Sequence, residues 1–137
     1  MDLDITTASE SLTRNLAATI RLLPRRDGTI YVETPFEFAD GDAYPIHLRP
    51  AKAGGVRVTD RGHTLMHLSY QMDVDSLRDG AKARAFEQVL REQGLSEESG
   101  ELFVEGPMDD LAELVFRFSH ALTRVADITF LNRIRTE

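Results

Sequence analysis

The sequence predicts an α+β fold, in which a small, mainly antiparallel sheet of three to four strands is packed by three helices. Between residues 29 and 68, three short strand-like runs alternate with turn signals and then lead into a helix. The segments on either side carry apolar residues at helical spacing. No internal repeat, low-complexity tract or linker is visible, so residues 1–137 are predicted to form a single domain.

The first predicted helix begins at Thr7, because Thr7-Ala8-Ser9-Glu10 has the spacing of a capping box. Apolar residues then recur at helical intervals, namely Leu12, Leu16, Ile20 and Leu23. Pro24 is expected to end the helix, since proline lacks the amide hydrogen that a helix interior needs. The helix is therefore expected to lay its apolar stripe on the sheet.

Three strands are predicted over residues 29–36, 44–49 and 56–59, which are rich in β-branched, aromatic and alternating apolar residues. Turn residues separate these runs, namely Asp40-Gly41-Asp42 and Gly54-Gly55. Asp60 follows the third strand and is expected to cap a helix that runs over residues 63–70, because its short carboxylate can accept hydrogen bonds from exposed amides.

The second half of the chain is predicted to add two helices and a further short strand. Residues 71–80 form a connector, residues 81–93 a helix that ends before Gly94, and residues 101–105 a strand. A long helix then starts near Pro107 and carries the strongest apolar stripe of the chain, made of Leu111, Leu114, Val115, Phe118, Leu122 and Val125. The first, the third and this last helix are expected to cover the sheet.

The composition bounds the class of protein. Hydrophobic residues make up 42% of the chain and charged residues 28%, which is typical of a soluble globular domain. The absence of cysteine excludes disulfides, thiolate zinc sites and cysteine nucleophiles. The acidic start of the chain does not resemble a signal peptide, and no apolar run could span a bilayer. We therefore expect a cytoplasmic protein that does not bind membranes.

The net charge of −7 is concentrated in the second half of the chain. Residues 92–116 contain eight acidic residues and no lysine or arginine. A negative field repels phosphate backbones, so nucleic-acid binding is disfavoured. A solvated acidic face is the simplest interpretation, and a surface that imitates the charge of nucleic acid on a partner protein is the alternative.

Three short motifs carry a resemblance to a known family. They are E-T-P-F at residues 33–36, G-D at residues 41–42 and T-D-R-G-H-T-L at residues 59–65. The series resembles that of domain of unknown function 1828, a family of bacterial and phage proteins, over nearly the whole chain. The resemblance implies a link with phages and mobile elements, and a domain that often precedes a second one. It transfers no activity and no catalytic residues.

Asp60, His63 and His67 are the strongest candidates for a metal site. Spacings of three and four residues place them on one helix face, and two imidazoles with a carboxylate are suitable metal ligands. Zinc hydrolases with two histidines at this spacing have a glutamate directly after the first one, whereas this chain has Thr64. The structural interpretation is that Asp60 is a cap and that both histidines lie at the edge of the core.

Asp42, Asp60 and Arg61 are a second candidate group, which with Thr64 makes up the predicted binding residues. Two carboxylates and a guanidinium at one end of the sheet could act as an acid–base pair or bind Mg²⁺ and phosphate. The structural interpretation is that both aspartates are turn and cap residues and that Arg61 pairs with one of them.

The leading functional hypothesis is a small non-catalytic protein-interaction domain of phage or mobile-element origin, which needs no cofactor and binds another protein. The alternative is a metal-dependent hydrolase-like enzyme that uses Asp60, His63 and His67.

Two further features concern partners. The apolar end of the last helix predicts a homodimer through this helix, since Ile128, Phe130, Leu131 and Ile134 exceed what one helix face normally hides. A small basic cluster near the first helix is a candidate docking patch, and consists of Arg14, Arg21, Arg25 and Arg26.

Overall fold

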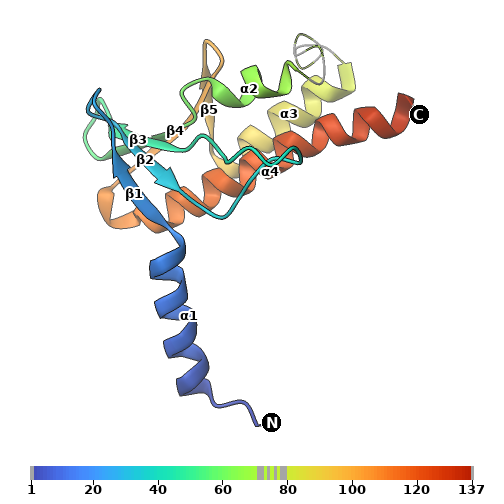
Figure 1. Ribbon diagram of the computed structural model, residues 1–137. Helices are drawn as coiled ribbons and strands as arrows, with labels where there is room; N and C mark the ends of the chain where they lie inside the picture. Colours follow the sequence, from blue (N-terminus) through green and yellow to red (C-terminus); the bar gives the residue numbers. More distant parts are fainter. Residues whose placement is uncertain (1, 71–72, 74, 76, 78–79, 137) are drawn as a thin grey trace.

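A computed structural model describes residues 2–70, 73, 75, 77 and 80–136, with side chains described as far as residue 128 (Figure 1). Its elements, in chain order, are α1 (Ile5–Thr19), β1 (Arg21–Pro24), β2 (Ile30–Glu33), β3 (His47–Pro50), β4 (Val56–Thr59), α2 (His63–Leu68), α3 (Gly80–Gln93), β5 (Ser96–Glu98), β6 (Glu101–Gly106), the 3-10 turn η2 (Met108–Asp110) and α4 (Leu111–Thr136). The predicted α+β class is confirmed.

The strands form one antiparallel sheet of six strands in the order β1-β2-β3-β4-β6-β5. The predicted count of three to four strands is therefore wrong. β1 was missed because Leu23 continues the apolar spacing of the preceding helix, although it pairs with Tyr31 of β2. β5 was missed because Ser96–Glu98 has no apolar alternation and is held by its hairpin with β6.

The first helix differs from its prediction at both ends. Asp4 caps α1, since its carboxylate accepts hydrogen bonds from the Thr7 amide at 3.2 Å and the Thr7 hydroxyl at 2.8 Å. The helix ends at Thr19, because pairing with β2 draws the next residues into β1. No residue of α1 is buried, and Figure 1 shows the helix projecting away from the sheet. The prediction that this helix covers the sheet is wrong.

The core lies between one face of the sheet and α4. The predicted stripe of α4 is confirmed, since Phe118, Leu122 and Val125 are completely buried. They belong to the same cluster as sheet residues of alternating register, namely Val32, Leu48, Val58, Leu102 and Val104. α3 packs beside α4 and supplies Phe86 and Val89 to the same cluster (Figure 1). The core is thus complete without α1.

At least half of the acids in segment 92–116 are paired with bases from outside it. Arg49 and Arg57 both contact Glu101, and Arg57 also bonds to Glu105 at 2.8 Å. Glu92 pairs with Arg124, and Glu113 pairs with Arg117. At least four of the eight acids are therefore partly neutralised, which reduces the negative field that the sequence predicts for this segment.

The C-terminal helix leaves the dimer prediction open. Ile128 is buried in the core, so it does not contribute to an exposed apolar patch. The side chains of Phe130, Leu131 and Ile134 lie outside the described residues, and a homodimer through this helix stays a prediction. In the part of the chain that the structure describes, each helix is too short or too polar to cross a bilayer.

Candidate functional site

The corner between β4 and α2 is built around Asp60, whose side chain is completely buried. The carboxylate accepts hydrogen bonds from three backbone amides, those of Gly62 at 2.8 Å, Leu102 at 2.9 Å and Thr64 at 3.3 Å. Burial raises the pKa of Asp60, and these hydrogen bonds, with the Thr64 hydroxyl, act in the opposite direction. Asp60 therefore ties the start of α2, at Thr64, to β6, at Leu102.

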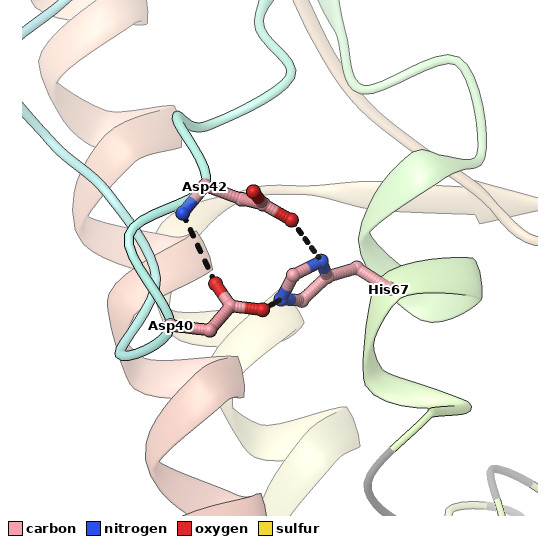
Figure 2. A group of neighbouring side chains, drawn as sticks. All are labelled: Asp40, Asp42 and His67. Atoms are coloured by element: carbon pink, nitrogen blue, oxygen red, sulfur yellow. Dashed lines mark hydrogen bonds and ion pairs between the residues drawn. The ribbon is translucent and has the colours of Figure 1, made fainter.

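A second cluster joins the loop after β2 to α2, and Figure 2 shows its three side chains. Nε2 of His67 lies 3.1 Å from a carboxylate oxygen of Asp40, and Nδ1 lies 3.4 Å from one of Asp42. The imidazole also stacks on Phe38, with ring centres 4.2 Å apart. One ligand atom from each of Asp40, Asp42 and His67 lies within 4.8 Å of the others, which is compatible with a metal ion.

His63 and Arg61 face a different part of the molecule. The His63 ring lies edge-on to His47, with ring centres 6.3 Å apart. Arg61 forms an ion pair of 3.2 Å with Asp27, in the turn between β1 and β2. Both residues thus belong to the side of the corner that faces the β1–β2 hairpin.

The structure therefore does not bring the predicted groups together. The Asp60 carboxylate accepts hydrogen bonds from backbone amides, and the His63 ring lies against His47. Of the three predicted metal ligands, only His67 lies beside other carboxylates, those of Asp40 and Asp42. Asp42 is on the His67 side and Arg61 on the Asp27 side. Among the described residues, the one group of three potential metal ligands is the set of Asp40, Asp42 and His67.

Sequence reasoning missed Asp40, which looked like an ordinary turn residue. Its carboxylate does accept a hydrogen bond from the Asp42 amide at 3.1 Å, as a turn residue should. The second role of Asp40 is its contact with His67 of α2, which lies 27 positions later in the chain. This contact depends on the loop folding against α2, so no local sequence pattern predicts it.

The family described as "Domain of unknown function DUF1828" matches residues 34–125. The chain belongs to this family. The resemblance of the T-P-F, G-D and T-D-R-G motifs is thereby confirmed. The matched region contains the corner between β4 and α2 and the loop that carries Asp40 and Asp42, but it leaves out α1, β1 and β2. No curated protein and no solved structure matches the chain.

Within this DUF1828 protein, the T-D-R-G motif shapes the backbone. The Thr59 hydroxyl accepts a hydrogen bond from the Arg61 amide at 3.0 Å and donates to Glu101. Arg61 and Gly62 both have a positive φ, at 55° and 80°, which turns the chain sharply into α2. The motif therefore explains the strand-to-helix corner without a reactive centre.

Proposed function

We propose that this DUF1828 protein is a small non-catalytic interaction domain of phage or mobile-element origin, and that it binds another protein through α1. The origin rests on the family resemblance. The observation that carries the binding role is that α1 has no buried residue, although it bears an apolar stripe.

α1 is poorly suited to stand alone in water. Seven of its 15 residues are threonine, serine or asparagine, which are weak helix formers. Isolated helices shorter than about 12–15 residues are marginal even with favourable sequences, because helices in proteins are stabilised mainly by packing. A partner that covers α1 would supply this packing.

The apolar stripe of α1 has the spacing that helix-binding grooves recognise. Ile5, Ala8, Leu12 and Leu16 follow one another at intervals of three or four residues. The side chains of Leu12 and Leu16 are 62% and 46% exposed. Leu22 of the edge strand β1 is also exposed and extends the apolar surface just beyond the helix.

The area and the charge favour a different protein over a second copy. A few aliphatic side chains on one helix bury far less than the roughly 1,200 Å² of a stable interface unless a groove surrounds them. Two copies would also bring together two chains of charge −7. A concave, apolar groove on a partner without strong negative charge fits both observations.

A pair of double variants tests this role. Leu12→Ser with Leu16→Ser should abolish recovery of the specific protein that the wild type captures from an extract of its native host. Ala17→Ser with Ala18→Ser introduces the same side chain away from the apolar stripe of α1 and should leave capture intact. Neither pair should shift the thermal midpoint by more than about 2 °C, because α1 lies outside the core.

Two results would contradict the proposal. One is equal capture by both double variants. The other is a homodimer in light scattering that only the leucine variant loses, which would make a second copy the partner of α1.

A second candidate function is metal binding at Asp40, Asp42 and His67, which replaces the predicted set of Asp60, His63 and His67 in the enzyme alternative. The spacing of the three ligand atoms supports it. Calorimetric titration with Mn²⁺ and Zn²⁺ should then give one site per chain, which Asp42→Asn weakens by about tenfold or more. Asp109→Asn, an exposed acid on η2, is the control. No saturable binding to the wild type would remove this candidate.

A further inference from the structure

An open groove lies on the face of the sheet opposite α4. Its volume is about 920 Å³, which is in the range of small-molecule sites. Tyr31 and His47 form a registered pair of β2 and β3 whose side chains point away from the core face. The β1–β2 hairpin, with Arg25, Arg26 and Asp27, and the residues that follow Asp60, with Arg61 and His63, complete the walls.

The groove is basic, whereas the chain as a whole has a charge of −7. Three arginines line it against a single acid, Asp27. They come from two separate segments, since Arg25 and Arg26 lie in the hairpin and Arg61 follows β4. Guanidinium groups that converge from different elements can hold a phosphate through several charge-assisted hydrogen bonds.

Arg61 already holds an anionic group of the chain itself. Its guanidinium lies 3.2 Å from the Asp27 carboxylate. That carboxylate is anchored from the other side by the Thr29 amide at 3.0 Å and the Thr29 hydroxyl at 2.6 Å. The Asp27 carboxylate thus marks a position in the groove where Arg61 can bind an anion.

The pKa of His47 responds to the positive charges that line the groove. Its side chain is buried, and this burial lowers the pKa of His47. The carbonyl of Pro45 acts in the opposite direction, whereas the charges of Arg61, His63 and Arg25 lower the pKa further. An anion that enters the groove would offset these positive charges and raise the pKa of His47.

We propose that this groove binds the phosphate group of a small phosphorylated molecule. The acidic remainder of the chain repels a long polyanion, but a small ligand experiences mainly the charges within about one Debye length, roughly 8 Å. Tyr31, over which Arg25 lies at 5.0 Å, forms an aromatic wall beside the arginines and can contact the rest of the ligand. This role is separate from α1 and does not depend on the protein-binding proposal.

The test uses inorganic phosphate and adenosine monophosphate as probes, at an ionic strength of about 0.15 M, by calorimetry and by the NMR titration of His47. The wild type should bind at least one probe saturably, with a rise in the pKa of His47. Arg61→Gln should weaken binding about ten- to hundredfold, and Arg26→Gln about tenfold. Asp27→Asn should tighten binding, since it removes the competing carboxylate while an amide oxygen can still accept the Thr29 hydrogen bonds.

Arg84→Gln removes an equal charge from the exposed part of α3 and should change affinity by less than about twofold. Tighter binding of the nucleotide would support contact with the Tyr31 wall, and equal binding would support recognition of phosphate alone. Three results would overturn the proposal: no saturable binding of either probe below about 10 mM, affinities that neither Arg61→Gln nor Arg26→Gln changes, or tighter binding of a single-stranded oligonucleotide than of both probes.

Discussion

Replacing Asp60 with alanine should lower the free energy of unfolding by about 3 to 5 kcal/mol. The substitution leaves the amides of Gly62, Thr64 and Leu102 without their acceptor in a corner where no side-chain surface of Asp60 is exposed. Each buried amide that loses its partner costs about 1–3 kcal/mol. The bond from the Asp60 amide to the Leu102 carbonyl at 3.1 Å and the bond from the Thr59 hydroxyl to Glu101 remain, so the corner should loosen without the sheet losing its order.

Urea denaturation measures this loss, and Asp109→Ala is the matched control. Asp109 is an exposed aspartate at the start of η2, and its removal should change the free energy of unfolding by less than about 0.5 kcal/mol. A loss below about 1 kcal/mol for Asp60→Ala would mean that water or other groups satisfy the three amides. Asp60 would then be available for a chemical role, contrary to the structural role assigned to it here.

Replacing Gly55 with alanine should lower the free energy of unfolding by about 3 kcal/mol or more. A Cβ at this position would overlap the carbonyl oxygen of Gly106 and lie 3.1 Å from its carbonyl carbon. Both atoms belong to the backbone at the end of β6, where Gly106 is the partner of Val56, so they cannot move without disturbing the pairing of β4 with β6. The positive φ of 83° adds strain for any residue with a side chain.

The adjacent glycine separates the two effects. Gly54 has a φ of 96°, but a Cβ there would meet no atom within 4 Å. Gly54→Ala should therefore lower the free energy of unfolding only by the cost of the left-handed backbone conformation, about 1–2 kcal/mol. Equal losses for the two variants in urea denaturation would show that the contact with Gly106 can relax, and would contradict the close approach of the two loops.

The parts of the fold that sequence reasoning predicted correctly are those in which a local pattern and tertiary packing agree. The stripe that contains Phe118 and Leu122 is long and periodic, and it covers the sheet as expected. α1 shows the limit of this reasoning, since Leu12 and Leu16 establish an amphipathic helix but not the surface against which it packs. β1 was not predicted because Leu23 fits the helical spacing of the preceding residues, and only pairing with β2 decides its conformation.

The candidate sites were less predictable because their members meet across loops. His63 and His67 are four residues apart on one helix, yet His63 faces β3 while His67 faces the loop that carries Asp40 and Asp42. The groove combines Arg25, which had been assigned to a docking patch, with Arg61 from a distant corner. The positive charge of the groove arises only because the fold brings the β1–β2 hairpin next to the corner after β4.

Hydrogen exchange at the backbone amides of α1 tests the central claim most directly, because it measures whether this helix is packed. In the isolated protein, the α1 amides should exchange orders of magnitude faster than those around Phe118 in α4, since α1 buries no side chain. In the complex with the captured partner, the same amides should become protected. Protection equal to that of α4 in the isolated protein, or rapid exchange of α1 in the complex, would contradict a docking role for this helix.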